Sequence, residues 1–408
     1  MEDTMDLKKI FTEIFGETAG GNDAIRVFYA PGRVNIIGEH TDYNGGLVLP
    51  CAINMGTYAL IRLRDDASVA DNGEPRFAST NSVPNAWEIY PRGIVHHMQR
   101  ALSRRADSPC LATDAHHGFE GTCGNLHVSP AFGFEGTCGN LHVPPAFGFE
   151  GMRGNPHVFP AHFDMLFSGN IPNGSGLSSS ASIEMATAVA LNETFALGFE
   201  MLELVKIARE SENEFCGVNC GIMDMFAIGT GKRGFATLLN CADMQFEYVP
   251  MRLGDFQLII LDTKKRRSLN ESRYNERRAE CEAGHPARMR HVKTENERVV
   301  AAANALRAGD VAALGRLLVE SHNSLRDDFE VSCFELDALV EAAIKNPSCV
   351  GARMTGAGFG GCAIALVERA KVAQFSAAVT EEYEKSVGYA PDIYPTESAD
   401  GAGAVNSL

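Results

Sequence analysis

Residues 169–182, with the sequence GNIPNGSGLSSSAS, combine glycines and hydroxyl side chains directly before a predicted helix. Glycine lets the backbone come close to a ligand, and the N–H groups in the first turn of a helix have no partner within that helix. These groups and the positive end of the helix dipole favour a bound phosphate. We expect the phosphates of a nucleotide to bind at Gly174, Ser175, Gly176, Leu177, Ser178, Ser179 and Ser180.

The alternative for this segment is a flexible linker in which a serine caps the next helix. The helical pattern that follows at once argues against a free linker. No GxxxxGK[ST] motif occurs in the chain. A nucleotide bound here would therefore lie in an architecture other than the P-loop fold.

Two acidic residues further along could complete a phosphoryl-transfer site. Apolar residues recur at helical spacing over 201–215, and Glu212 falls on their face. A carboxylate buried there needs a cation, which Mg²⁺ could supply with a hydroxyl of Ser179 or Ser180 as a second ligand. Asp224, in CGIMDMFAIG, could accept a proton from a sugar hydroxyl. The alternatives are a Glu212 head group in water and an Asp224 that caps a helix.

The segment PGRVNIIGEHTDYNGG, residues 31–46, gathers charged and polar groups in a turn-rich stretch. A hexose presents hydroxyls that both donate and accept hydrogen bonds, so carboxylates, imidazole and guanidinium at fixed positions can read its stereochemistry. The alternative is a solvated polar loop. The residues concerned are Arg33, Glu39, His40 and Asp42.

Mixed helical and extended segments must position these groups. Residues 24–53 read as short strands, with a hairpin turn at Asn44-Gly45. We predict helices that begin near Ser179 and cover 201–215, 275–303 and 333–344, and strands over 256–262 and 361–367. Interspersed elements of both kinds indicate a mixed α and β class.

Length and composition limit the possible functions. A chain of 408 residues most economically forms two domains. The formal charge of -16 argues against a nucleic-acid binder. Eleven scattered cysteines and an N-terminus without a signal-peptide core favour reduced thiols in the cytoplasm, and no apolar run is long enough to span a bilayer.

Three near-copies of a fifteen-residue unit begin at Gly118, Gly133 and Gly148. Each copy is rich in glycine and proline, so we expect an exposed excursion rather than a domain. Its Cys and His residues are explained by duplication without a zinc site, because the third copy has Arg153 at the cysteine position.

The motifs together resemble those of the galactokinase family. GRVNIIGEHTDYNGG is similar to the galactokinase signature, GLSSSAS to the phosphate loop of the wider superfamily of galactokinase, homoserine, mevalonate and phosphomevalonate kinases, and MTGAGFGGC to its third motif. SRYNERRAEC and YPTESADGAGA resemble further family blocks. The order and spacing match over nearly the whole chain except about residues 106–161.

This resemblance implies a fold and a set of roles. It implies an α+β fold with an N-terminal domain over 1–249, like domain 2 of ribosomal protein S5, a ferredoxin-like domain over 250–408, an insertion over 106–161, and an active site between the domains. It implies ATP and Mg²⁺ as cofactors. The implied roles are catalysis for Asp224 and Arg33, sugar contact for Glu39, His40, Asp42, Gly221 and Tyr274, nucleotide contact for Trp87, Gly356 and Gly358, and Mg²⁺ binding for Glu212 with Ser179 or Ser180.

Two residues in the motifs depart from the family pattern. Met225 follows Asp224 where glutamine is usual, and Ser175 stands where alanine or glycine is usual. Three activities remain open: phosphorylation of galactose at C1, phosphorylation of a related sugar such as N-acetylgalactosamine or arabinose, and catalytically silent sensing of galactose and ATP. The expected partners are galactose and MgATP, with no nucleic acid and no membrane, in a monomer or weak oligomer.

Deleting residues 118–161 with a short linker should preserve the kinase activity that the resemblance implies and leave the thermal midpoint unchanged or higher. Loop-closure entropy grows only slowly with loop length, so removal of a long excursion costs little. Thermal melts and turnover of the deletion variant check this prediction. Loss of folding on deletion, or stoichiometric zinc in the intact protein, would contradict it.

Overall fold

The computed structural model describes residues 4–17, 21–64, 74–81, 87–106, 162–172, 174–265 and 270–405. The repeats over 118–161 lie outside the described residues, so the expectations for them stay predictions. Chain contacts group residues 1–98 and 161–408 into one unit and 99–160 into another. The account below concerns the first unit.

Four strands from the first part of the chain and one from its C-terminal end form a five-stranded sheet with the order β12-β1-β3-β5-β4. Its neighbours are antiparallel except β4 and β5, which are parallel. The first two long strands are nearly continuous in apolar residues because both faces of the sheet are covered. The strands are β1 (Arg26–Asn35), β3 (Pro50–Leu63), β4 (Arg76–Ser79), β5 (Phe163–Gly169) and β12 (Gly403–Ala404).

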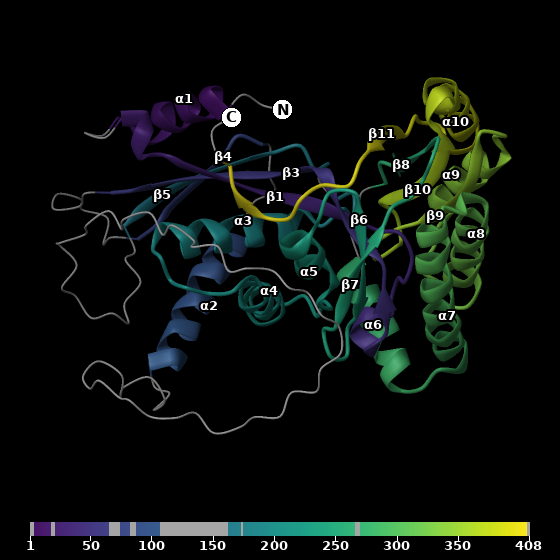
Figure 1. Ribbon diagram of the computed structural model, residues 1–408, viewed down its shortest axis with the longest axis horizontal. Helices are drawn as coiled ribbons and strands as arrows, with labels where there is room; N and C mark the ends of the chain where they lie inside the picture. The colour runs from purple at the N-terminus through teal and green to yellow at the C-terminus, as the bar shows by residue number, and fades with distance from the viewer. Residues whose placement is uncertain are drawn as a thin grey trace, which may run out of the picture. The chain divides into compact units, whose positions relative to one another are not determined.

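Helices cover both faces of this sheet (Figure 1). An N-terminal helix lies on one face, and the helix that follows the predicted phosphate loop lies on the other, where it packs on β1 and β3. The helices are α1 (Thr4–Phe15), α2 (Ile89–Ala106), α3 (Ser179–Thr194), α4 (Met201–Glu210) and α5 (Met223–Thr230), with shorter turns η1 (Gly21–Ala24), η2 (Asp42–Asn44) and η3 (Ser211–Phe215).

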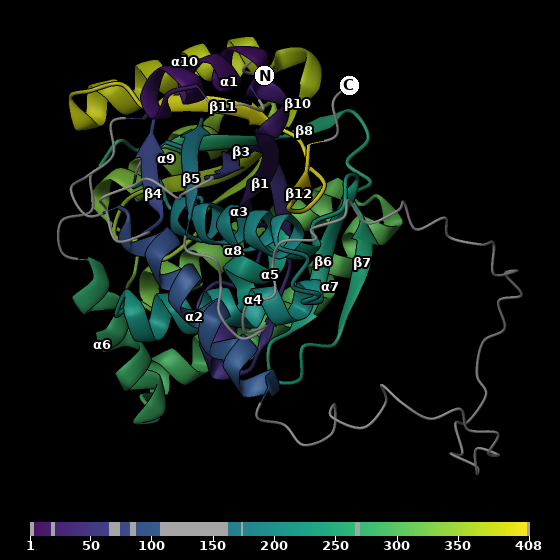
Figure 2. The ribbon, with the colours of Figure 1, turned by 90° about the vertical axis from the view of Figure 1, so that its left-hand side faces the viewer.

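Two further antiparallel sheets follow, one of three strands with the order β2-β6-β7 and one of four with the order β11-β8-β10-β9. Figure 2 shows the three-stranded sheet beside α5 and α7. The strands are β2 (Leu47–Val48), β6 (Phe235–Asn240), β7 (Phe246–Pro250), β8 (Phe256–Asp262), β9 (Cys349–Met354), β10 (Cys362–Glu368) and β11 (Asp392–Thr396).

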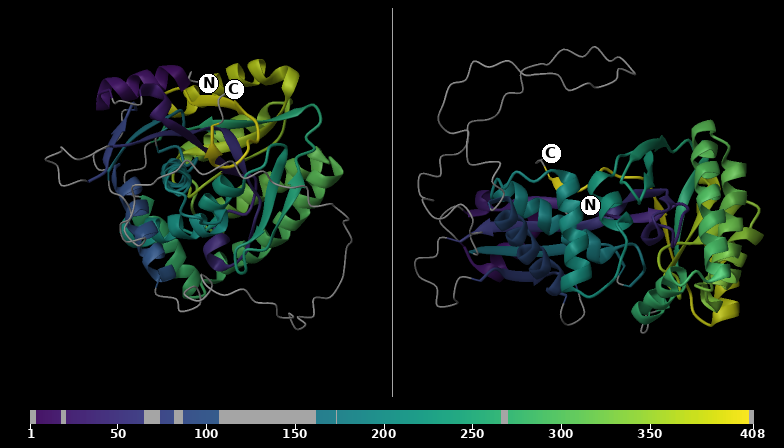
Figure 3. Two further views of the ribbon diagram at one scale, coloured as in Figure 1. Left: turned by 60° about the vertical axis from the view of Figure 1, so that its left-hand side comes forward. Right: turned by 90° about the horizontal axis from the view of Figure 1, so that it is seen from below.

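The four-stranded sheet is buried on both faces. Along β8, Leu258 and Ile260 join one hydrophobic cluster, whereas Ile259 and Leu261 join another, as the two-residue period of a strand requires. Helices α8 (Val311–Asp327), α9 (Phe334–Lys345) and α10 (Val372–Val387) pack against it, among the green and yellow ribbons of Figure 3. Helix α7 (Pro286–Ala308) packs on α8, α6 (Asn270–Glu282) packs on α7, and the short turn η4 (Arg369–Lys371) precedes α10.

The sequence predictions can now be compared with these elements. The α+β class, the helix from Ser179 and the strand over 256–262 are confirmed. The single helix predicted over 275–303 is wrong, because Gly284, with φ of 74°, separates α6 from α7. The turn at Asn44-Gly45 exists, and the strands on either side of it, β1 and β3, pair antiparallel up to Asn35 and Pro50. The short strand β2, which lies between the turn and β3, pairs with β6. The domain boundary at residue 249 stays a prediction.

The described helices include none that is both long enough and apolar enough to cross a membrane.

Candidate functional site

An ion pair between Arg33 and Asp224 joins the first sheet to the start of α5. Nε and Nη2 of Arg33 donate to the two oxygens of Asp224 at 2.8 and 2.9 Å, and Nη1 donates to the carbonyl of Gly176 at 2.6 Å. Arg33 lies on β1 with its side chain 5% exposed, whereas that of Asp224 is 27% exposed. Burial alone lowers the pKa of Arg33, but Asp224 and Glu39 raise it above its usual value. The cation therefore fixes a carboxylate that remains open to a substrate.

The phosphate loop lies directly against this pair. Ser178, with φ of 62°, precedes the first residue of α3 and donates from Oγ to Oδ2 of Asp224 at 2.6 Å. A serine in the left-handed region is strained, and such strain is concentrated at functional sites. In this structure the Ser178 hydroxyl donates to Asp224, and its contact with phosphate stays a prediction. Ser175 is buried, with no hydrogen-bond partner for Oγ among the described residues.

A second carboxylate, Glu212, faces the first turn of α3. Its Oε1 accepts from Ser180 Oγ at 2.9 Å, and its Oε2 accepts from Cys220 Sγ at 3.3 Å. The helix predicted over 201–215 is confirmed, although its last turn, η3, is π-helical and follows α4 without a break after Glu210. Glu212 is nevertheless buried, and burial followed by repulsion from Asp224 raises its pKa to about 7. A bound cation would offset both effects.

The sugar-reading candidates Glu39 and His40 are turned into the protein. Oε1 of Glu39 accepts from Thr355 Oγ1 at 2.9 Å and from the backbone N–H of Gly356 at 2.6 Å, and Oε2 accepts from the Asn35 side chain. Its side chain is 1% exposed. The third glycine motif, predicted to close over substrate, thus holds the predicted sugar segment in place.

His40 is fixed by contacts on each side of its ring. Its Nδ1 lies 2.9 Å from Tyr43 Oη, its Nε2 lies 3.2 Å from the carbonyl of Ala357, and the ring stacks on Phe329 at 4.8 Å. Because a carbonyl only accepts, Nε2 carries the proton. Burial lowers the pKa of His40 to about 3, so the imidazole is neutral at physiological pH. The ring of Tyr274 lies 5.6 Å from it.

Asp42 and Gly221 meet at the edge of the same group. A Cβ on Gly221 would lie 1.8 Å from Oδ2 of Asp42, so a larger residue there would displace the Asp42 carboxylate. Burial, followed by repulsion from Asp224, raises the pKa of Asp42 to about 6. Asp42 and Asp224 therefore influence one another electrostatically, and sugar contact by Asp42 and Gly221 stays a prediction.

The remaining predicted residues lie further along the loops. Trp87 packs edge-on against Phe167 of β5, at 5.5 Å between ring centroids, beside the strand that leads into the phosphate loop. Gly358 has φ of 82°, and a Cβ there would lie 2.2 Å from the carbonyl of Val331. Met225 is fully buried, and Asp224 accepts hydrogen bonds from Arg33 and Ser178. Nucleotide contact by Trp87, Gly356, Gly358 and Ser179 stays a prediction.

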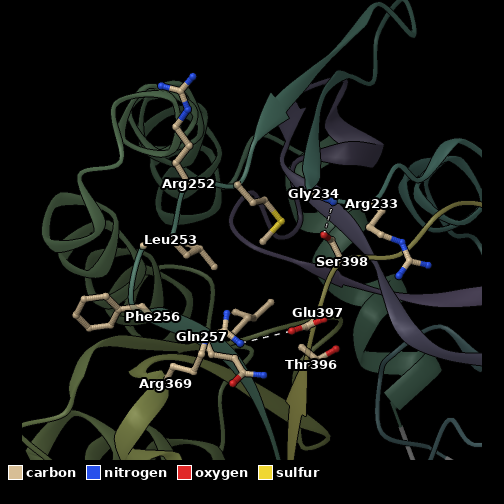
Figure 4. A pocket seen from close by; sticks show the side chains of 13 residues that line it. Arg233, Gly234, Arg252, Leu253, Phe256, Gln257, Arg369, Thr396, Glu397 and Ser398 are labelled. Carbon is tan, nitrogen blue, oxygen red and sulfur yellow. Dashed lines mark hydrogen bonds and ion pairs between the residues drawn. The ribbon is translucent and has the colours of Figure 1, made fainter.

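A cavity of about 340 Å³ includes none of the predicted site residues (Figure 4). Its polar groups already satisfy one another: Arg369 pairs with Glu397 at 3.4 Å, and Ser398 Oγ accepts from Gly234 N at 2.8 Å. The guanidinium of Arg252 points away from the other lining side chains. This cavity is separate from the candidate site.

Known proteins are similar to this chain over nearly its whole length. Three family profiles match: the galactokinase galactose-binding signature over residues 9–63, the GHMP kinases N terminal domain over 149–232 and the GHMP kinases C terminal domain over 302–385. The galactokinase of Enterococcus faecalis is 40% identical, over 96% of this chain and 97% of its own, and that of Bacillus subtilis is 37% identical over 97% and 98%.

Solved structures agree with the sequence relatives. The crystal structure of Lactococcus lactis galactokinase complexed with galactose superposes with a TM-score of 0.79 at 33% identity, covering 98% of this chain and all of that one. The mevalonate kinase of L. major, at 17% identity and a TM-score of 0.60, shares the fold. With relatives of this identity aligned over nearly the full length, the chain belongs to the galactokinase family of the GHMP kinases.

Proposed function

We propose that this chain transfers the γ-phosphate of MgATP to the C1 hydroxyl of α-D-galactose, giving galactose 1-phosphate and ADP. The observation that carries the proposal is the Arg33–Asp224 pair, set against the start of α3 and beside Asp42. An acceptor for a hydroxyl proton and a phosphate-binding helix end thus lie next to each other.

In this mechanism Asp224 accepts the proton of the C1 hydroxyl as that oxygen attacks the γ-phosphorus, and ADP leaves with the electrons of the broken bond. The guanidinium of Arg33 orients Asp224 through two hydrogen bonds and adds positive charge beside the transferring group. The backbone N–H groups at the start of α3 bind phosphate oxygens. Phosphoryl transfer needs such positioning and charge stabilisation more than covalent chemistry.

The residues around Glu212 fit a magnesium ion. Ser180 and Glu212 present oxygen atoms, the ligands that Mg²⁺ prefers, and their side chains already meet at 2.9 Å. When bound, the ion neutralises negative charge on the nucleotide phosphates. Because burial and Asp224 disfavour the charged form of Glu212, a positive ion is the partner that its carboxylate lacks.

Galactose-dependent formation of ADP by the purified protein tests the proposal. Galactose should be turned over in preference to N-acetylgalactosamine and arabinose in the same assay. Turnover of another sugar with a higher kcat/KM would reassign the substrate, and MgATP and galactose binding without turnover would favour the sensor. From the scattered cysteines and the acidic charge we further propose a cytoplasmic monomer or weak oligomer.

The pH dependence of kcat/KM for galactose should follow the protonation of Asp42. Its pKa is raised to about 6, first by burial and then by Asp224, so as the pH falls below about 6 the carboxylate gains a proton and accepts hydrogen bonds less strongly. We expect kcat/KM for galactose to fall there at saturating MgATP, where the bound cation keeps Glu212 in its charged form. The charged and titratable groups facing Asp42 are Arg33, Glu39, Asp224, Tyr43, Tyr274 and Cys241.

An Asp42→Asn variant is the control for this profile. It should show a lower kcat/KM for galactose at neutral pH and a flatter response between pH 5 and 7, a window set by the raised pKa of Asp42. An acid limb that persists unchanged in the variant would assign the titration to another group.

A further inference from the structure

Helix α7 supports the sugar segment from the side away from the phosphate loop. Three of its residues, His291, Glu295 and Asn296, form hydrogen bonds with the backbone of residues 38–47. None of them was singled out by the sequence motifs, and none belongs to the ion pair or the phosphate loop.

Glu295 is the central residue of this support. It is fully buried, and its Oε1 accepts from the backbone N–H of Gly38 at 3.0 Å and from Ser321 Oγ at 2.6 Å. Its Oε2 accepts from Nε of Arg298 at 2.7 Å. Burial by itself raises the pKa of Glu295, but basic neighbours, Arg353 and Arg298 among them, hold it below the usual value. Burying a charged carboxylate costs free energy, which hydrogen bonds from several partners offset. The same hydrogen bonds fix the orientation of the carboxylate.

Two other residues of α7 fix the ends of the same segment. His291 is buried, with Nε2 3.1 Å from the carbonyl of Glu39 and Nδ1 2.9 Å from Ser324 Oγ. Asn296 accepts from the backbone N–H of Leu47 at 2.6 Å through Oδ1. The backbone on each side of His40 and Asp42 is therefore held by one helix.

Arg353 connects this support to the carboxylate of Glu39. Its side chain is fully buried, and Nη1 donates to the carbonyls of Asn35 and Ile36 at 3.0 and 3.1 Å while lying 3.5 Å from Oε1 of Glu39. Its Nε and Nη2 have no hydrogen-bond partner among the described residues. A guanidinium buried in this way depends on the charge of Glu39, and it also helps to lower the pKa of Glu295.

We propose that Glu295 and Asn296 are positioning residues for the sugar, which act through the backbone of residues 38–47 and hold Glu39, His40 and Asp42 in the geometry that binds it. This inference rests on the proposed function, since it assigns these residues to galactose binding rather than to nucleotide binding or to phosphoryl transfer. A misplacement of about 1 Å in such a segment is enough to weaken binding strongly.

The test compares the KM values for the two substrates. Glu295→Gln removes the charge at nearly constant volume and places an amide N–H group against the Arg298 donor. We expect the KM for galactose to rise about tenfold or more, with the KM for ATP within about twofold. Equal rises in both KM values, or a change in kcat alone, would overturn the proposal.

Asn296 provides a second test that does not disturb the buried charges. Asn296→Ala removes the acceptor for Leu47 N and should raise the KM for galactose several-fold. Asn296→Asp keeps an acceptor oxygen there but loses the donor to the carbonyl of Val292, so it should restore the KM in part. Lys293→Ala, at an exposed position of the same helix, is the matched control. If Ala and Asp behave alike at 296 while Glu295→Gln also leaves the galactose KM unchanged, the support is structural only.

Failure of this inference can be separated from failure of the proposed function. If the wild-type protein does not phosphorylate galactose, the proposed function is wrong. If the wild type does so and the α7 variants leave its galactose KM unchanged, only the positioning role is wrong. Galactose binding measured by calorimetry without ATP gives the same comparison independently of turnover.

Discussion

Asp224→Asn should lower kcat by about 10²- to 10⁴-fold, the range lost when a general base is removed. The change keeps the volume of the side chain and removes its charge and basicity. Arg33 can still donate to the amide oxygen and to the carbonyl of Gly176, so the buried guanidinium keeps partners. MgATP affinity should therefore change little, and the loss should appear in kcat rather than in the KM for ATP.

The measurement is steady-state formation of ADP together with nucleotide binding by calorimetry. A thermal melt of the variant separates lost chemistry from lost folding. Asp255→Asn, at an exposed position between β7 and β8, is the matched control and should leave both constants unchanged. A kcat within tenfold of the wild type would exclude Asp224 as the base and leave it a binding residue.

The sequence motifs predicted which groups belong to the site better than how those groups are paired. Arg33, Glu39, Glu212 and Asp224 were all identified from residue type and pattern. Yet Ser178 bonds to an aspartate 46 positions later, and Glu39 to a threonine 316 positions later. No local periodicity in the sequence can predict such pairs, because they form only when the strands and helices have packed together.

Local patterns also missed two features of the backbone. A repeat of 3.6 residues places Glu212 on the apolar face of one helix, but it cannot reveal the extra residue of a π-helical turn after Glu210. No local pattern in HVKTENERV marks Glu295 and His291 as buried, yet both side chains are buried. Their burial depends on the backbone of residues 38–47, which lies about 250 positions earlier in the chain and offers them hydrogen bonds.

The magnesium requirement should change most at Glu212. Glu212→Gln replaces a carboxylate by a neutral amide, a poorer ligand for a hard dication, while the amide oxygen can still accept from Ser180. We expect the Mg²⁺ concentration for half-maximal turnover to rise roughly tenfold or more, with part of the lost rate recovered at high Mg²⁺. ADP binding should show the same shift when it is titrated at several Mg²⁺ concentrations.

Glu214→Gln is the matched control for this prediction, because Glu214 lies in the same π-helical turn and is exposed. Its dependence on Mg²⁺ concentration should match that of the wild type. This result would exclude the explanation that removing any charge from the turn changes the magnesium requirement. Ser180→Ala should shift the magnesium titration in the same direction and by less, since a hydroxyl is a weaker ligand than a carboxylate. A titration that is unchanged in Glu212→Gln would leave the Ser180–Glu212 contact as a link between α3 and η3 that only stabilises the fold.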